Sequence, residues 1–501
     1  MQDSYRSRLL IVSNRLPLKV VPGADGKATF EPGSGGLVTA LAPVLRDRGG
    51  TWIGWPGVDA EKAPDNLPEL MEQAGKKLGY RIRPVALKKK EVKLFYEGFS
   101  NEVLWPIFHD FPSVANFNPK YWDAYRAVNR KYAEAIAEHG RPGDFIWIHD
   151  YQLMLVAEEC RNLGVDGLFS FFLHIPFPSL GMFLKIPWRT EILRGLLAYD
   201  LLGVQTAWDR RNLMECVRSL IPEVAWRGRG RVTSASLEGR DVRIGDFPIS
   251  IDYRGFMRQA KSDPVLQGVR AIRKTLDKRT IILGVDRLDY TKGILYRLEA
   301  FYEALLRYPE LREKTTLVQV AVPSRTAVPQ YKRLRARIER MVGRINGQFT
   351  RPGWIPVHYI FRSLSREELL SYYRAADIAL VTPLKDGMNL IAKEYCVTNV
   401  DNDGVLILSE FAGAASQLQI GALLVNPFDV VGTADAIFRA CKMAASERKS
   451  RMRKMRTAIR KQDVFWWVDS FLRSAIAKDL SEFPALEEYS PLAAGEGVEA
   501  G

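Results

Sequence analysis

The sequence predicts an α/β protein with two doubly wound domains, each a parallel β-sheet covered by helices on both faces. Three observations indicate this class. Residues 280–445 alternate short apolar strands with amphipathic helices, as repeated βα units require. Those strands are apolar along nearly their whole length, which is typical of a sheet buried on both faces. The chain has 501 residues, enough for more than one domain of the usual ~100–200 residues.

The second half of the chain carries the more regular pattern. Short apolar runs predict strands, and longer segments with helical spacing of apolar residues predict the helices between them. We expect strands at 280–285, 316–322, 357–361, 378–381, 405–408 and 422–425, and helices at 295–306, 331–345, 366–375, 389–396 and 434–445.

The first half is similar but less regular. Strands are expected at 9–13, 145–148, 168–173 and 201–205, a Gly-rich loop at 33–36 opens a helix at 37–45, and a Thr/Ser-rich patch at 231–242 predicts a short β insertion. A boundary near residues 248–252 gives a first domain at 1–250 and a second at 251–462. The apolar face of a last helix at 463–485 predicts that it crosses back to the first domain, before a disordered tail at 486–501.

Composition excludes a disordered, a collagen-like or a disulfide-framework protein. Hydrophobic residues make up 47% and charged residues 26%, which is ordinary globular usage. No run approaches the ~20 apolar residues that span a bilayer, so we expect a cytoplasmic, soluble protein. The four cysteines are scattered, and the five histidines lack metal-ligand spacing, so we expect reduced thiols and no metal site. The net charge of +14 favours anionic partners, although the basic runs at 88–90 and 448–461 are interpreted as solvated faces.

The loop after strand 280–285 carries two cations, Arg287 and Lys292. In doubly wound sheets, ligands bind beyond the carboxyl ends of the strands. Two cations on one tight loop can bind adjacent phosphates, Arg as a fork and Lys as a point charge. The neighbouring carboxylates lack the DxD spacing of a metal site, so the cations would replace Mg²⁺. The alternative is two surface cations beside two surface acids.

The loop after strand 378–381 carries Asp386 and leads into a helix that carries Glu394. Free N–H groups at a helix start bind anions or sugar hydroxyls, and Asp386 could instead be the helix N-cap. Glu394 lies about two turns further along, where a carboxylate can accept hydrogen bonds from ribose hydroxyls. A surface salt bridge is the alternative for Glu394.

Further charged and aromatic residues lie at comparable positions in the chain. His149, Asp150, His174, Arg15 and Arg325 each follow a predicted strand. His149 alone is better explained as a hydrogen-bonded core histidine. Trp52, Trp55, Tyr96 and Trp105 have rings that can stack on sugars, although Trp52 in particular fits a core position.

Taken together, these segments resemble the trehalose-6-phosphate synthases and related retaining nucleotide-sugar glycosyltransferases. The resemblance runs in order over roughly residues 8–465, which makes it far more specific than any single motif. The matching segments are 11–15, 35–37, 52–55, 101–106, 147–151, 172–178, 287–293, 382–395 and 406–414.

The resemblance implies a GT-B architecture, in which two Rossmann-like domains face a central cleft. It implies retaining transfer of glucose from UDP-glucose to glucose 6-phosphate by front-face attack, with the leaving phosphate taking the acceptor proton. Neither a metal nor another cofactor is expected, and a homo-oligomer is compatible with the family. The acceptor residues implied are Arg15, Trp55, Tyr96, Trp105 and Arg325, and the donor residues are Gly36, Asp150, His174, Arg287, Lys292, Asp386, Leu390 and Glu394. Of these, Arg287, Lys292, His174 and Asp150 would be catalytic.

Two alternative functions stay open at this point. A glucosylglycerol-phosphate synthase would use the same donor chemistry with glycerol 3-phosphate as acceptor, although segments 15–17 and 35–37 resemble the trehalose branch more closely. A non-catalytic regulatory or nucleic-acid-binding protein would use the +14 charge. That class is disfavoured because the cations lie at strand ends and no nucleic-acid-binding module accompanies them.

Overall fold

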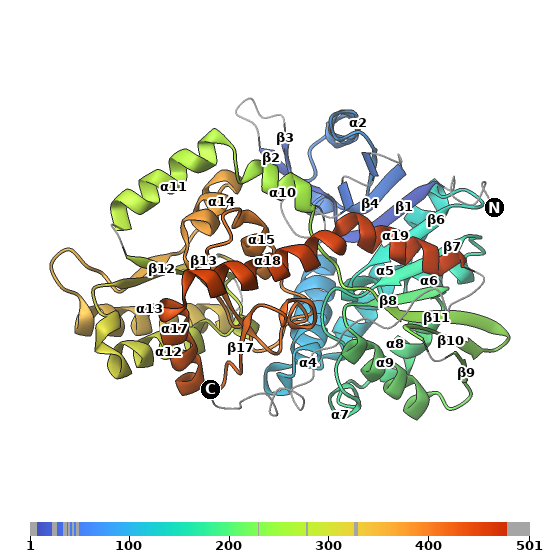
Figure 1. Ribbon diagram of the computed structural model, residues 1–501. Helices are drawn as coiled ribbons and strands as arrows, with labels where there is room; N and C mark the ends of the chain where they lie inside the picture. The colour runs from blue at the N-terminus through green and yellow to red at the C-terminus, as the bar shows by residue number, and fades with distance from the viewer. Residues whose placement is uncertain are drawn as a thin grey trace. The chain divides into compact units, whose positions relative to one another are not determined.

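The computed structural model describes residues 8–22, 28–33, 38, 41–42, 45–46, 50–228, 230–276, 279–324 and 329–477. Its internal contacts divide the chain into two compact units (Figure 1). Among described residues, unit 1 comprises those up to 249 together with 465–477, and unit 2 comprises 250–464. Residues 34–36 of the Gly-rich loop, most of the helix predicted at 37–45 and the tail from 478 lie outside the described residues.

Unit 1 is built on a nine-stranded sheet in the order β5-β4-β1-β6-β7-β8-β11-β10-β9. The strands from β5 through β11 pair in parallel, and β10 and β9 continue the sheet in antiparallel pairing. In chain order the bounds are β1 Leu9–Arg15, β4 Gly50–Trp55, β5 Arg81–Pro84, β6 Phe145–His149, β7 Leu168–Phe172, β8 Leu201–Val204, β9 Ala225–Arg227, β10 Val232–Leu237 and β11 Arg240–Asp246.

The prediction of a β insertion at 231–242 is wrong in one respect. Its strands are real, but β11 pairs in parallel with β8 and so belongs to the main sheet. A separate hairpin of β2 (Leu18–Pro22) and β3 (Ala28–Pro32) was not predicted. The helices of this unit are α2 Leu67–Leu78, α3 Lys89–Glu91, the π-helical segment Val92–Leu104, α4 Trp105–Phe108, α5 Pro119–His139, α6 Val156–Asn162, α7 Leu180–Phe183, α8 Arg189–Leu197 and α9 Ala207–Leu220.

The last helix, α19 (Val464–Ile476), packs on the sheet of unit 1. Trp467 donates its Nε1–H to the Phe247 carbonyl at 3.1 Å, and Phe471 stacks on Trp147 with ring centroids 4.4 Å apart. A Cβ on Gly203 would lie 2.5 Å from the Phe471 ring, so glycine is needed there for this close approach.

Unit 2 is built on a six-stranded, fully parallel sheet in the order β14-β13-β12-β15-β16-β17. Every strand predicted for this half is present. The bounds are β12 Thr280–Arg287, β13 Thr315–Val322, β14 Val357–Ile360, β15 Ile378–Val381, β16 Val405–Ser409 and β17 Leu423–Val425. Together, the two sheets confirm the predicted class of doubly wound parallel α/β domains.

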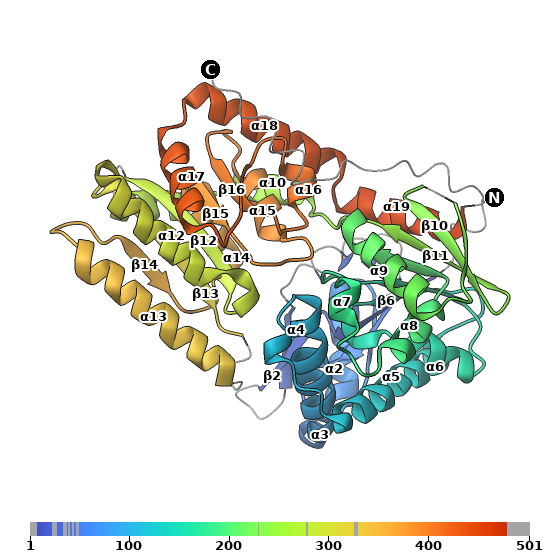
Figure 2. The same cartoon turned by 90° about the horizontal axis from the view of Figure 1, so that it is seen from below.

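Helices cover both faces of the unit 2 sheet. Figure 1 shows α12, α13 and α17 on one side of β12 and β13, and α11 and α14 on the other. Figure 2 gives the same cartoon from below. The helix bounds are α10 Tyr253–Gln259, α11 Asp263–Leu276, α12 Ile294–Arg307, α13 Pro329–Phe349, α14 Arg366–Ala375, α15 Leu390–Thr398, α16 Ala415–Leu418, α17 Val430–Lys442 and α18 Ala445–Lys461.

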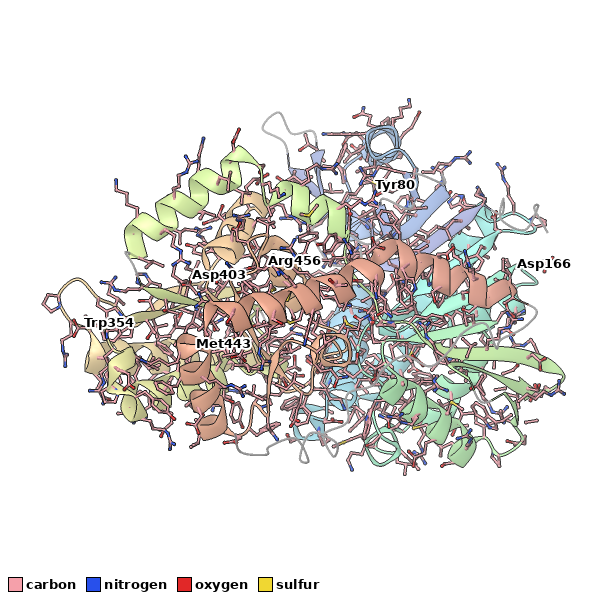
Figure 3. The ribbon with its side chains drawn as sticks, viewed as in Figure 1. Tyr80, Asp166, Trp354, Asp403, Met443 and Arg456 are labelled. Atoms are coloured by element: carbon pink, nitrogen blue, oxygen red, sulfur yellow. The ribbon has the colours of Figure 1, made fainter. Side chains whose placement is uncertain are left out.

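The basic run at 448–461 forms most of α18, and its basic side chains other than Arg456 are exposed or partly exposed, as predicted for a solvated face. Met452, Met455 and Ile459 are buried on this helix. Arg456, labelled in Figure 3, is 8% exposed and donates to the Asn399 carbonyl at 2.5 Å. The lysines at 88–90 are exposed as well, as expected. Among the described helices, none has the length and apolar character needed to cross a bilayer.

Candidate active site

In unit 2 the loop after β12 is tightly folded against the end of β15. Arg287 is the exposed last residue of β12, and a 3-10 turn at Tyr290–Lys292 leads into α12. Gly293 has φ 64, and a Cβ there would lie 2.3 Å from the Thr382 carbonyl oxygen. Glycine is therefore required by both its backbone conformation and the space available. The turn places Lys292, 8% exposed, beside the loop that follows β15.

Lys292 forms an ion pair with Asp386 on that second loop. The Lys292 Nζ lies 2.5 Å from Asp386 Oδ2, which also accepts from Asn389 Nδ2 at 3.1 Å. The backbone of Asp386 is fixed as well, since its N–H donates to the Phe411 carbonyl at 3.1 Å. An ammonium held this way is oriented before any ligand binds.

Asp386 is not the N-cap of α15, so that alternative is wrong. Asn389 occupies the cap, and its side chain accepts from the Ala392 N–H at 3.3 Å. Asn389 has φ 71, a left-handed conformation that asparagine tolerates better than most residues. Leu390 is the first residue of α15 and is partly exposed beside the loop.

Glu394 also lies on α15, and it is not part of a surface salt bridge. Its Oε2 accepts from the Tyr373 hydroxyl on α14 at 2.9 Å. Burial raises the pKa of the Glu394 carboxyl, while the Tyr373 hydrogen bond and the positive charge of Arg366 act in the opposite direction. Tyr373 was not identified from the sequence, because its hydroxyl reaches Glu394 only through the packing of two helices.

In unit 1, His149 at the end of β6 contacts His174, which follows β7. His149 is fully buried, and its Nδ1 lies 3.1 Å from Nε2 of His174. This confirms the interpretation of His149 as a hydrogen-bonded core residue. Burial lowers the pKa of both imidazoles, that of His174 to about 3. Both rings are thus neutral at physiological pH, and His174 can donate or accept a hydrogen bond without carrying charge.

Asp150 joins the same group at the end of β6. Its Oδ1 accepts from the backbone N–H of His174 at 3.2 Å. Asp150 has φ 78, an uncommon conformation for a residue other than glycine, and such residues concentrate at functional sites. The structure therefore brings together Asp150 and His174, two of the predicted donor residues.

A second group in unit 1 joins three of the predicted acceptor residues, and we call Arg15, Trp55 and Tyr96 the Arg15 cluster. The guanidinium carbon of Arg15 lies 4.6 Å from the centroid of the Trp55 ring and 5.6 Å from that of Tyr96. Arg15 and Trp55 are paired across β1 and β4. Stacking on the rings orients the exposed guanidinium and leaves its in-plane N–H groups directed away from the ring faces.

Trp105 is linked to this cluster through neighbouring side chains. It is 4% exposed, and its ring lies 5.8 Å from that of Tyr151. The Tyr151 hydroxyl donates to Asn101 Oδ1 at 3.0 Å, and Asn101 Nδ2 donates to the Tyr96 carbonyl at 2.7 Å. Trp52, by contrast, is fully buried, which confirms a core position.

Two predicted site residues, Gly36 and Arg325, lie outside the described residues. Within the part of the chain that the structure describes, no group of three or more His, Cys, Asp or Glu side chains could hold a metal ion. The cysteines are free thiols, as predicted. Burial raises the pKa of all four to about 12: Cys160, Cys216, Cys396 and Cys441.

Two doubly wound units, with cations and carboxylates following the carboxyl ends of their strands, are the architecture of the GT-B glycosyltransferases. The chain belongs to glycosyltransferase family 20, whose model matches residues 7–477. This confirms the resemblance and the fold class that it implied. This range includes all the site residues in the part of the chain that the structure describes.

Relatives and solved structures agree with this assignment. The chain is 45% identical to trehalose-6-phosphate synthase of Mycolicibacterium vanbaalenii, over 94% of this chain and 96% of the relative. It is 43% identical to that of Mycobacterium tuberculosis H37Rv, over 93% and 94%.

Among solved structures, an α,α-trehalose-phosphate synthase (UDP-forming) from Burkholderia xenovorans, in complex with glucose 6-phosphate, has TM-score 0.83 and 35% identity over 94% of this chain and 100% of that one. The Escherichia coli enzyme bound with UDP-2-fluoro glucose has TM-score 0.84 and 35% identity, over 94% and 99%.

Proposed function

We propose that this glycosyltransferase transfers glucose from UDP-glucose to glucose 6-phosphate with retention, giving trehalose 6-phosphate and UDP. The observation that carries the proposal is the likeness, over nearly the whole chain, to synthases solved with glucose 6-phosphate and with a UDP-glucose analogue. A further solved neighbour, also a trehalose-6-phosphate synthase, is described as transferring with retention. The arrangement of side chains in each unit supports the same reading.

Unit 2 offers the groups that a nucleotide-sugar donor needs. Lys292 and the exposed Arg287 supply positive charge for the diphosphate, and Glu394 supplies a carboxylate for the ribose hydroxyls. Asp386 is held beside Lys292, where it can accept from hydroxyls of the donor sugar. We assign the remaining donor contacts to Leu390 in this unit and to Gly36, Asp150 and His174.

Unit 1 offers the groups that a phosphorylated sugar needs. The Arg15 guanidinium can bind a phosphate through two N–H groups while its face stays on Trp55 and Tyr96. Trp105 and Arg325 complete the proposed acceptor set.

The chemistry follows from charge placement. When the glycosidic bond breaks, negative charge develops on the departing UDP, and the Arg287 and Lys292 cations stabilise it. The leaving phosphate takes the proton of the acceptor hydroxyl as the new bond forms on the same face. His174, which is neutral, acts through hydrogen bonding rather than as an acid. In this proposal the cations take the place of a metal ion, and a cytoplasmic location and any homo-oligomer stay predictions.

The test is a matrix of UDP-release assays. The purified chain is incubated with UDP-, GDP- or ADP-glucose and with glucose 6-phosphate or glycerol 3-phosphate. We expect release of nucleoside diphosphate with UDP-glucose and glucose 6-phosphate, and a non-reducing disaccharide phosphate as the product. Release only with glycerol 3-phosphate would identify a glucosylglycerol-phosphate synthase instead.

A further inference from the structure

Arg297, on the first turns of α12, lies under the donor loops of unit 2. The side chain is 1% exposed. Its Nη1 donates to Asp286 Oδ2 at 2.5 Å and to Gln319 Oε1 at 3.2 Å. Its Nε donates to Thr382 Oγ1 at 3.1 Å, and its Nη2 to the Lys292 carbonyl at 3.4 Å. One guanidinium therefore contacts residues from β12, β13 and both donor loops.

The sheet leaves room for this side chain through a glycine inside β12. A Cβ on Gly284 would lie 2.8 Å from Arg297 Nη1 and 2.6 Å from Gln319 Oε1. Glycine weakens a strand interior and marks a close approach by another group. A buried ion pair often stabilises a fold no more than apolar residues of similar volume would. Stability alone thus does not account for a buried cation at this position.

The position of Arg297 relates it to the ion pair of the donor site. Thr382 follows the last residue of β15 and begins the loop that carries Asp386. Lys292 ends the turn after β12, and its side chain pairs with Asp386. Arg297 donates to the Thr382 side chain in the loop after β15 and to the Lys292 carbonyl in the loop after β12. A direct bond from the Leu384 N–H to the Thr291 carbonyl, at 2.7 Å, joins the same loops beside it.

We propose that Arg297 is a positioning residue that fixes the two donor loops against each other, so that Lys292 meets the donor diphosphate already oriented. Arg297 acts through these loops and does not itself touch the substrate. The inference rests on the proposed function, since it assumes that Lys292 binds the diphosphate. It predicts that weakening the contacts of Arg297 impairs the donor and spares the acceptor.

Two substitutions weaken those contacts to different degrees. Arg297→Lys keeps the positive charge beside Asp286, but an ammonium lacks the planar fork that reaches several acceptors in fixed directions. Thr382→Val is close to isosteric and removes the hydroxyl that accepts from Arg297 Nε, leaving the buried charge pair in place.

A matched control is Arg456→Lys in the same unit. Arg456 is also buried and bonds to the Asn399 carbonyl, in a loop that precedes β16. In a parallel sheet, loops that precede strands lie at the edge opposite those that follow them. The control therefore loses a buried guanidinium at the C-terminal end of α15, away from the loops that carry Lys292 and Asp386.

The experiment uses the full chain and measures kcat, the KM of each substrate and the apparent Tm, with UDP affinity from calorimetry. We expect Arg297→Lys to raise the KM of UDP-glucose and the Kd of UDP about tenfold, the loss of about one charged hydrogen bond. We expect Thr382→Val to raise both about threefold, in line with a neutral hydrogen bond. The KM of glucose 6-phosphate should stay within about twofold, and Arg456→Lys should lower the Tm alone.

Three results would overturn the inference. The first is a folded Arg297→Lys protein with wild-type UDP affinity, and the second is an equal loss of UDP affinity in Arg456→Lys. If Arg297→Lys does not fold, wild-type UDP affinity in Thr382→Val is the third. Calorimetry tests the inference separately from the proposed function. A wild-type protein that binds UDP but releases none from UDP-glucose would refute the proposed function. The UDP affinities of the variants would still test the role of Arg297.

Discussion

The cations of the two units are held in different ways. In unit 1, Arg15 is exposed and lies on the rings of Trp55 and Tyr96. In unit 2, Lys292 is 8% exposed and lies against a carboxylate on another loop, above the buried Arg297–Asp286 pair. Aromatic rings orient a guanidinium without occupying its hydrogen-bonding edge, whereas a carboxylate partner takes up at least one of the three N–H donors of an ammonium.

This difference matches what each cation has to do. A stacked, exposed guanidinium suits binding of a phosphate that remains on the substrate throughout. A cation that stabilises charge appearing only during the reaction has to be fixed beforehand, because reorientation at that moment would cost free energy. The diphosphate already carries negative charge in UDP-glucose and gains more as UDP departs. We therefore expect substitutions of Lys292 to weaken donor binding and, more strongly, turnover, and substitutions of Arg15 to act on acceptor binding.

The largest effect is expected for Lys292→Ala. Loss of a preorganised charge at the departing diphosphate should lower kcat by about 10²–10³-fold. Steady-state UDP release measures this, and circular dichroism checks that the protein is folded. The exposed Lys449, substituted in the same way, is the control and should have no effect. Near-normal turnover in Lys292→Ala would refute the role given to this residue.

Arg15→Lys should have the next largest effect. The charge is kept, but the ammonium cannot stack in a plane on two rings or bind a phosphate with a fork. A loss of about one charge-assisted hydrogen bond corresponds to about a tenfold rise in the KM of glucose 6-phosphate. The KM of UDP-glucose should be unchanged, and equal rises for both substrates would contradict the assignment of the Arg15 cluster to the acceptor.

Tyr373→Phe should have a smaller effect, confined to the donor. The substitution removes the hydroxyl that donates to Glu394 and leaves the ring in place. Loss of one such bond predicts about a two- to tenfold rise in the KM of UDP-glucose. With a 2′-deoxyribose donor the rise should be smaller, because the carboxylate then has one ribose hydroxyl fewer to accept from. An undiminished rise with that donor would argue against a ribose contact by Glu394.

The last effect falls on stability rather than on activity, and it concerns pH and the pair of His149 and His174. Burial lowers the pKa of both below the ordinary 6.5, that of His174 to about 3. Their neutral state contributes stability that is fully present above about pH 6.5 and is lost as the pH falls from there towards 3, because the unfolded chain then binds the extra protons. Each imidazole changes the free energy of unfolding by at most about 1.4 kcal/mol per pH unit in this window.

This pH dependence can be assigned by comparing variants. The apparent Tm of the wild-type protein should fall between pH 6.5 and 5, and it should fall less steeply in His174→Asn, which has no titrating ring. Other groups contribute equally to both proteins. The same slope in both would show that the histidine pair is not responsible.

The sequence predicted the sheet of unit 2 almost completely, because its strands are buried on both faces and therefore apolar throughout. In unit 1 it missed β4, and it missed β5, whose residues 81–84 read Arg-Ile-Arg-Pro and lie at a sheet edge. The assignment of β11 to an insertion had a similar cause, since a strand with four charged residues among seven gives no sign of pairing in parallel with β8.

The site was predictable where residues follow strands, which is how Arg287, Lys292 and Asp386 were identified. The partners of those residues were not predictable. Asp386 lies 94 positions from Lys292, and nothing local indicates that the two meet. Arg297 could have been suspected from two signs together: a basic residue on the apolar face of α12 and Gly284 inside the neighbouring strand.

The central claim is that protein cations, rather than a bound metal ion, stabilise the departing UDP. The direct measurement is the rate of UDP release from UDP-glucose and glucose 6-phosphate in the presence of EDTA and again after Mg²⁺ is added in excess. The account predicts equal rates under both conditions, together with the loss of turnover in Lys292→Ala. Activity abolished by EDTA and restored by Mg²⁺ would contradict it.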